Sequence, residues 1–109
     1  MNLSSDIWVY ALIRRVQLGG AFATVVRRGD ARGGAILVKT IDHRSGAARL
    51  YAQAVGSDGE SLWMQPVSGA EAELDAYVER AARRDPDIWV VEIEDQDARR
   101  FLTEPLDES

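Results

Sequence analysis

Two stretches of the chain repeat their apolar residues at helical spacing. In residues 7–16 a broad apolar face follows residues 4–6 (Ser-Ser-Asp), whose side chains can cap a helix, and Gly19 with Gly20 ends the run. Between residue 71 and Pro86 one apolar stripe runs along a helical face, made up of Leu74, Tyr77, Val78, Ala81 and Ala82. The pattern therefore predicts one helix near the N-terminus and a second in the C-terminal half.

The second helix has the sharper boundaries. Residues 68–71 (Ser-Gly-Ala-Glu) fit an S-x-x-E capping box, in which the Ser hydroxyl and the Glu carboxylate satisfy free backbone N–H groups of the first turn. Acidic residues crowd its start and arginines its end, as the helix dipole favours. Pro86 disfavours helical geometry at Asp85, so we expect the helix to end there.

Five other apolar runs have the spacing and the Val, Ile and Thr content of β-strands. They cover residues 21–28, 35–42, 48–55, 61–67 and 87–94. Short turns rich in Gly, Ser and Asp join the first four runs. Because tight turns join antiparallel neighbours, we expect the first two runs to form a hairpin within a four-stranded meander.

The element order α-β-β-β-β-α-β indicates an α+β fold. We expect a single domain over residues 1–103, with a mainly antiparallel sheet of about five strands and both helices on one face. Residues 96–102 can add a short helical turn, and residues 104–109 form an acidic tail that we expect to fray. A chain of 109 residues suits one hydrophobic core.

The amino-acid composition limits the cellular compartments and the kinds of reactive site that we expect for this protein. The chain has no cysteine, which excludes disulfides, thiolate metal sites and thiol nucleophiles and suits a reducing cytosol. No run approaches the roughly 18 apolar residues of a membrane span, and the start MNLSSDIW lacks the positive region of a secretory signal. We therefore expect a cytoplasmic protein that does not enter a membrane.

Charge is unevenly distributed between the two halves. Residues 1–55 carry eight basic and three acidic side chains, whereas residues 56–109 carry five basic and fifteen acidic ones. Opposite charges of this kind either pair within the fold and across a dimer, or leave an anion-binding face on the N-terminal half. The acidic balance makes nucleic acid an unfavourable partner.

The acidic strand 87–94 is the first candidate site. With a period of two, Glu92 and Glu94 point the same way, roughly 7 Å apart, and Asp87 and Asp95 flank them. Two carboxylates could reach one divalent cation, but a metal site needs several oxygen ligands in fixed geometry. We therefore interpret them as a solvated or arginine-paired strand end and expect neither a metal nor a cofactor.

The arginine-rich turn RRGDARGG is the second candidate. Arg28 and Arg32, with glycines around them, could hold an anion. However, a strand rather than a helix follows, and neither phosphate-loop motif is present. His43, the only histidine, lies in a turn without a neighbouring nucleophile, so a catalytic triad is not expected.

Three segments resemble a known family. WVYALIRR, GGAFATVVRRGDARGGAILVK and DPDIWVVEIED look like those of short alphaproteobacterial proteins grouped as a domain of unknown function, and the likeness spans nearly the whole chain. The resemblance implies a single cytoplasmic domain. It implies no activity, substrate or cofactor.

Three hypotheses about function remain open. The leading one is a non-enzymatic module that binds a protein partner or a second copy of itself, through a strand edge or the arginine hairpin. The second is a divalent-metal-dependent enzyme or a binder of small anions that uses Glu92, Glu94, Arg28 and Arg32. The third is a nucleic-acid accessory protein.

Overall fold

Two helices and five strands make up a three-layer molecule. The computed structural model describes residues 3–106. In chain order its elements are α1 (Ser5–Leu18), β1 (Phe22–Arg27), β2 (Ile36–Ile41), β3 (Ala48–Val55), β4 (Ser61–Gly69), α2 (Glu71–Arg84), β5 (Trp89–Glu94) and the 3-10 helix η1 (Ala98–Phe101). The predicted α+β class and element order are confirmed, and no described helix is long and apolar enough to cross a membrane.

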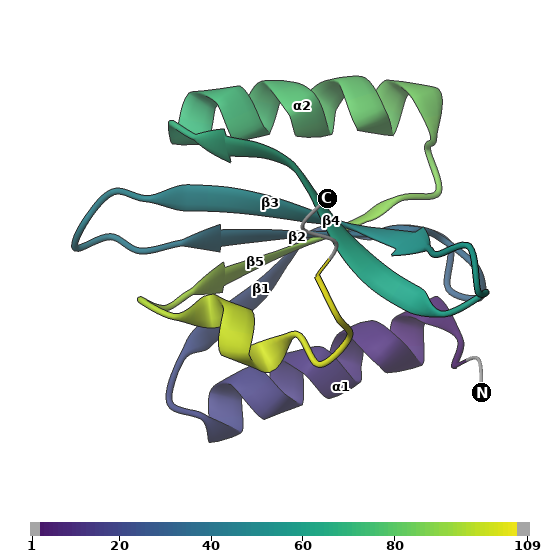
Figure 1. Ribbon diagram of the computed structural model, residues 1–109, viewed down its shortest axis with the longest axis horizontal. Coiled ribbons are helices and arrows are strands. Elements are labelled where there is room, and N and C mark those ends of the chain that lie inside the picture. The colour runs from purple at the N-terminus through teal and green to yellow at the C-terminus, as the bar shows by residue number, and fades with distance from the viewer. Residues whose placement is uncertain (1–2, 107–109) are drawn as a thin grey trace.

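The sheet departs from the predicted meander at β5. The strand order is β1-β5-β2-β3-β4, so the last strand lies between the first two (Figure 1). β5 pairs antiparallel with β1 and parallel with β2, whereas β2, β3 and β4 form the expected antiparallel ladder. The predicted hairpin of residues 21–28 with residues 35–42 is therefore wrong. Residues 88–91 of the last strand are buried on both faces, which suits a central position.

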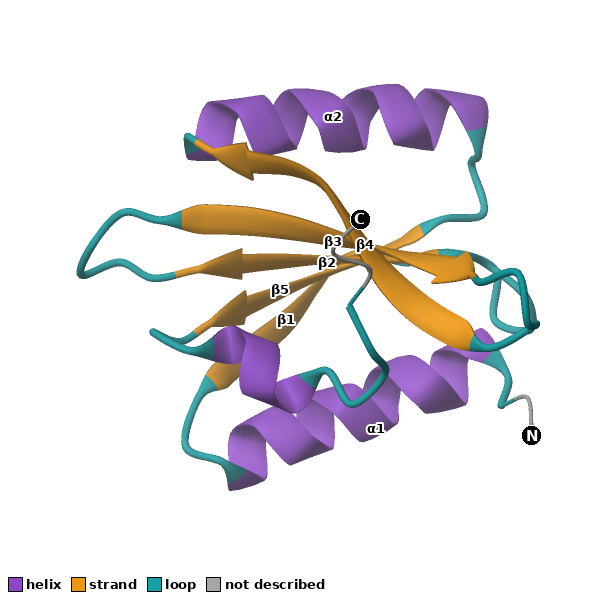
Figure 2. Cartoon of the chain, viewed as in Figure 1, coloured by secondary structure: helices purple, strands orange, loops and turns teal. Residues whose placement is uncertain are grey.

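The two helices cover opposite faces of the sheet, not the same face as predicted. α1 and η1 lie on one side and α2 on the other (Figure 2). Alternate residues of β5 serve the two cores: Trp89, Val91 and Ile93 pack with α1, and Val90 packs with α2. The sheet is thus buried on both sides at its centre, where all six residues of β2 are buried.

A glycine-rich crossover, residues 28–35, replaces the predicted hairpin turn. It passes over the start of β5, where the Asp30 amide donates to the Asp87 carbonyl at 2.9 Å and the Trp89 indole N–H donates to the Asp30 carbonyl at 2.7 Å. A Cβ added at Gly29 or at Gly34 would stand 2.1 Å from the Asp87 carbonyl oxygen. The two glycines therefore allow the close approach of two backbones, on either side of a short turn at residues 31–33.

Both helix starts differ in detail from the prediction. The capping box at residues 68–71 is wrong: the N-cap of α2 is Ala70, no side chain caps it, and Ser68 remains paired in β4. The first N–H groups of α1 donate to carbonyls of the crossover, which makes a serine cap unnecessary. The apolar stripe predicted for the second helix is confirmed against β2 and β3.

The start of the predicted tail packs against the sheet. The Trp63 amide donates to the Pro105 carbonyl at 2.8 Å, and Leu106 makes an isolated bridge with the same residue of β4. One carboxylate, Glu104, accepts from the indole N–H groups of Trp63 and Trp8. Residues 104–106 are therefore held by β4, and the remainder of the predicted tail, 107–109, lies outside the described residues.

Candidate functional site

The two predicted carboxylates of β5 point to the face that α2 covers in part. Glu92 lies opposite Lys39 in the parallel register of β5 with β2, and Glu94 lies two residues further along the same face. Their side chains remain partly exposed because α2 packs mainly over β2, β3 and β4 and leaves β1 and the end of β5 uncovered (Figure 1). The prediction that they share a face is confirmed.

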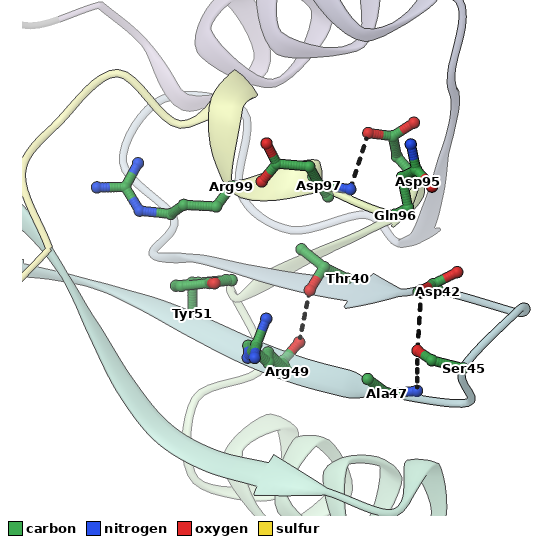
Figure 3. Close-up of a pocket in the computed structure, with 11 residues that line it drawn as sticks. Thr40, Asp42, Ser45, Ala47, Arg49, Tyr51, Asp95, Gln96, Asp97 and Arg99 are labelled. Carbon is green, nitrogen blue, oxygen red and sulfur yellow. Dashed lines mark hydrogen bonds between the residues drawn. The ribbon is translucent and has the colours of Figure 1, made fainter.

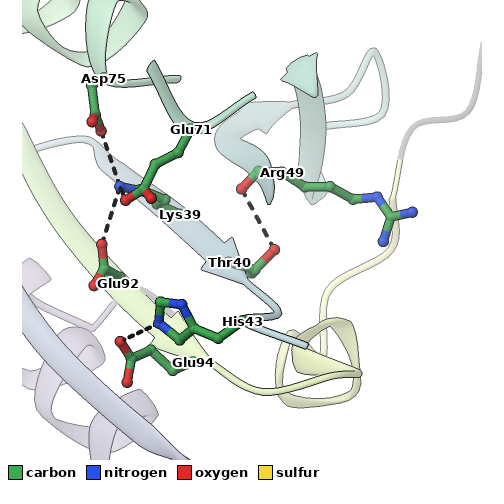
Figure 4. Close-up of polar contacts among 8 residues, drawn as sticks. All are labelled: Lys39, Thr40, His43, Arg49, Glu71, Asp75, Glu92 and Glu94. Carbon is green, nitrogen blue, oxygen red and sulfur yellow. Dashed lines mark hydrogen bonds and ion pairs between the residues drawn. The ribbon is translucent and has the colours of Figure 1, made fainter. Parts of the chain in front are cut away.

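A single buried lysine gathers the carboxylates into one cluster (Figure 4). The Lys39 Nζ atom lies 2.5 Å from Glu71 Oε2, 3.0 Å from Asp75 Oδ1 and 3.2 Å from Glu92 Oε1. The Lys39 side chain is only 7% exposed, whereas that of Asp75 is 62% exposed. The carboxylates therefore keep much of their hydration while they satisfy a nearly buried ammonium.

The electrostatics of this lysine cluster (Lys39, Glu71, Asp75 and Glu92) keep the ammonium charged. Burial works against the charge of Lys39, but the hydrogen bonds that its ammonium donates to Glu71, Asp75 and Glu92 outweigh burial and raise the pKa of the lysine above its ordinary value. A lysine held protonated in this way cannot act as a base or a nucleophile at neutral pH. The cluster therefore looks structural.

The same ammonium stands where a bound cation would sit among these carboxylates. Within residues 3–106, no group of three or more His, Cys, Asp or Glu side chains could hold a metal ion. Sequence reasoning missed this role of Lys39, although one signal was present: a lone lysine inside the apolar run AILVKTI must find carboxylate partners when the strand is buried.

The other carboxylate of β5 has a partner of its own. His43 Nε2 lies 2.8 Å from Glu94 Oε1 at the rim of an open hollow of about 380 Å³ that Phe22 also lines. The hydrogen bond to Glu94 raises the pKa of His43 above its ordinary value. Both side chains are well exposed, so this pair is a surface contact.

The predicted arginines lie at the opposite end of β5. Arg28 donates to the Tyr10 hydroxyl at 2.6 Å, and its guanidinium stands 5.2 Å from the centre of the Trp89 ring. Arg32 belongs to the crossover, beside the first turn of α1. Because the crossover covers the start of β5 and Glu94 ends the strand, the arginines and the carboxylates do not share one site.

A small polar hollow of about 210 Å³ lies between the ends of β2 and β3 and the segment that leads into η1 (Figure 3). It is lined by both signs of charge, among them Arg49 and Asp97. Asp95, another predicted candidate, also lines it and pairs with Arg100 at 3.2 Å. The mixture of charges gives this hollow no clear preference for a ligand.

The edge strand β1 carries two exposed apolar side chains. Phe22 is 72% exposed and Val26 is 58% exposed, and Thr24 lies between them. By their register with β5, Phe22 and Thr24 lie on the same face as Glu94 and Glu92. We refer to Phe22, Thr24 and Val26 as the edge patch.

Comparisons with known proteins agree with the fold. The model of a family described as "Protein of unknown function (DUF1491)" matches residues 3–103. The crystal structure of a DUF1491 family protein from Caulobacter crescentus is 68% identical, with 97% of this chain and 100% of that chain covered and a TM-score of 0.92. An NMR structure of a DUF1491 family protein from the same organism is 67% identical, with 99% of each chain covered and a TM-score of 0.88.

A more distant relative has the same architecture. The solution structure of a protein from A. tumefaciens is 37% identical, with 95% of each chain covered and a TM-score of 0.83. No curated protein matches the chain. The resemblance to alphaproteobacterial proteins of unknown function is thereby confirmed.

Proposed function

The chain belongs to the DUF1491 family of proteins of unknown function, and we propose that it is a non-enzymatic interaction module that pairs with a second copy of itself through β1. One observation carries the proposal: Phe22 is 72% exposed on an edge strand that has no strand on its outer side among residues 3–106. An exposed apolar edge offers unpaired backbone groups together with side chains that gain by burial.

The two edges of the sheet differ in how well they are protected. At the β4 edge, Pro66 has no N–H to offer, and the segment that contains Pro105 already pairs with the start of the strand. β1 has no proline, and its free edge is regular up to the bulge between Val25 and Arg27. Strand addition is therefore supported at β1 rather than at β4.

Shape and charge favour a second copy as the occupant. In an antiparallel pair centred near Thr24, Phe22 of each copy approaches Val26 of the other, which gives two contacts between an aromatic and a β-branched residue. The arginine end of one β1, at Arg28, then approaches the carboxylate end of the other, beside Glu94. The arrangement is isologous, so the same patch serves both copies.

The charge of Lys39 and the positions of the candidate arginines and carboxylates support a non-enzymatic role. Lys39 is held protonated, and the arginines and carboxylates of the metal-dependent alternative lie at opposite ends of β5. Carboxylates on the open face beside β1 disfavour nucleic acid as an occupant. The absence of cysteine supports the cytoplasm as the compartment.

The test is the molar mass in solution as a function of concentration. Sedimentation velocity from micromolar to millimolar protein should show a reversible dimer. Phe22→Glu places a carboxylate beside Glu94 in the apolar contact, so it should weaken dimerisation by at least about tenfold, a loss of roughly 1.4 kcal/mol. Hydrogen exchange gives a second readout, because amides of β1 should become less protected on dilution.

The matched control is a similar change on a surface far from β1. Val26→Glu should weaken the dimer, whereas Val55→Glu should not, although Val55 at the end of β3 is 74% exposed. A protein that stays monomeric at millimolar concentration overturns the proposal. A dimer equally insensitive to Phe22→Glu and Val26→Glu also overturns it, because another surface must then form the contact.

A further inference from the structure

A second surface, independent of the β1 edge, has the features of a ligand site. It is a groove of about 690 Å³ between α1, the crossover, the ends of β3 and β4, and the C-terminal segment. Its lining includes Trp8, Ala11 and Arg15 of α1, Arg32 of the crossover and Val55 of β3. A volume of this order is typical of sites that bind small molecules, which occupy about 300–1,000 Å³.

The basic residues of the groove have little to neutralise them. Within residues 3–106, the Arg15 guanidinium makes one hydrogen bond, from Nη2 to the Phe101 carbonyl at 3.3 Å, and its buried Nε has no acceptor. The guanidinium of Arg32 has no hydrogen bond or ion pair in that part of the chain. Arg32 is exposed, so solvent can satisfy its guanidinium, whereas the buried Nε of Arg15 is left without a protein acceptor in the described residues.

The one carboxylate of the groove is already committed to other donors. Glu104 accepts from the Trp63 indole N–H at 3.0 Å and from the Trp8 indole N–H at 3.4 Å. These bonds hold the tilted pair of indole rings, whose centroids are 5.6 Å apart, and Trp8 of this pair lines the groove. The lining therefore carries two arginines against the single carboxylate of Glu104, which keeps its charge, and this net positive charge lies beside the Trp8 ring.

We infer that this groove binds a small organic anion with an apolar body, such as a medium-chain carboxylate. The anionic head pairs with the guanidinium of Arg32, beside the first turn of α1, because charge-assisted bonds to arginine are strong and directional. Arg15, in the last turn of α1, adds a second positive charge further along the groove. The apolar body lies against Trp8, Ala11 and Val55. This inference assigns Arg32 an anionic partner, but at a site that does not include Glu92 or Glu94.

Octanoate is the probe for the test. Titration of the whole chain with octanoate should change the tryptophan emission, because Trp8 lines the groove, and should shift backbone amide signals of residues 8–15 and 32–36 in a saturable way. Acetate supplies the head without the body, and octanol supplies the body without the head. Each should bind at least about tenfold more weakly than octanoate, which corresponds to roughly 1.4 kcal/mol.

Three variants separate the groove from other surfaces. Arg32→Ala should weaken octanoate binding by about tenfold because an ionic hydrogen bond is lost. Ala11→Met should block the groove and abolish the shifts. Arg80→Ala removes an exposed arginine from α2, on the other side of the sheet, and should leave binding unchanged.

The results can overturn the inference cleanly. If octanol binds as tightly as octanoate, the anionic head does not contribute to binding and the inference is wrong. If octanoate binds equally well to the parent, Arg32→Ala and Ala11→Met proteins, its binding site lies outside the groove. If the folded parent shows no saturable shifts, the groove does not bind octanoate. None of these results depends on the oligomeric state, so they test the groove independently of the proposed dimer contact at β1.

Discussion

Lys39 shows at the scale of one residue how burial and charge are reconciled. Its strand is the most buried of the sheet, and its side chain is 7% exposed. An unpaired ammonium there would be strongly unfavourable, so three carboxylates from α2 and β5 surround it. The lysine cluster consequently ties the start of α2 to the centre of the sheet.

Removal of the ammonium should destabilise the fold. Lys39→Met keeps most of the side-chain volume but leaves three carboxylates facing one another. We expect a loss of about 1–3 kcal/mol in the free energy of unfolding at pH 7, less than for a fully buried pair because the carboxylates are partly exposed. Urea denaturation measures it, with Arg80→Met on the exposed side of α2 as the control.

The pH dependence of this contribution has a definite sign. The folded-state pKa of Lys39 is raised above its ordinary value of 10.5. Its stabilisation is therefore complete below pH 10.5 and is lost as the pH rises above that value. The gap between parent and Lys39→Met should narrow in alkali, and a variant as stable as the parent at pH 7 would contradict the role of the cluster.

His43 should report its contact with Glu94 directly. The folded-state pKa of this single histidine is raised above 6.5 by the hydrogen bond to Glu94. The contact therefore stabilises the fold fully below pH 6.5 and ceases to do so as the pH rises through the folded-state pKa. In an NMR titration of the imidazole, Glu94→Gln should lower the pKa, and equal values in parent and variant would show that the contact is absent in solution.

At the scale of elements, the position of β5 decides the architecture. The apolar spacing of residues 21–42 is that of a hairpin, and this spacing does not show that a strand almost fifty residues later will enter between the two runs. The glycines of the crossover carried the missing signal, because they are spaced for close packing of backbones. Sequence reasoning assigned them to a turn.

The crossover glycines allow a test of this packing with neighbouring residues. Gly34→Ala places a Cβ 2.1 Å from the Asp87 carbonyl oxygen, so it should cost about 2 kcal/mol or more in the free energy of unfolding. Gly33→Ala, one residue earlier, meets nothing closer than an Asp30 carboxylate oxygen at 4.0 Å and should stay within about 0.5 kcal/mol of the parent. Equal losses in urea denaturation would show that the crossover does not pack this tightly.

At the scale of the whole molecule, basic side chains from the N-terminal half of the sequence form ion pairs with acidic side chains from the C-terminal half. Lys39 and His43 come from the basic half, and their partners Glu71, Asp75, Glu92 and Glu94 come from the acidic half. The insertion of β5 between β1 and β2 brings Glu92 and Glu94 to these cations, and α2 supplies Glu71 and Asp75. It also leaves β1 as an edge strand of the sheet, where the side chains of the edge patch are exposed.

The sequence by itself determined the helices, most of the strands and the shared face of Glu92 and Glu94. These follow from period and local backbone preference, which act within one element. Only the tertiary structure decided the strand order, the opposite placement of the helices, the partners of Lys39 and the groove beside Arg15 and Arg32. Periodicity shows which side of an element is apolar, but the burial of one apolar side against another depends on all the elements together, and so does the neutralisation of each buried charge.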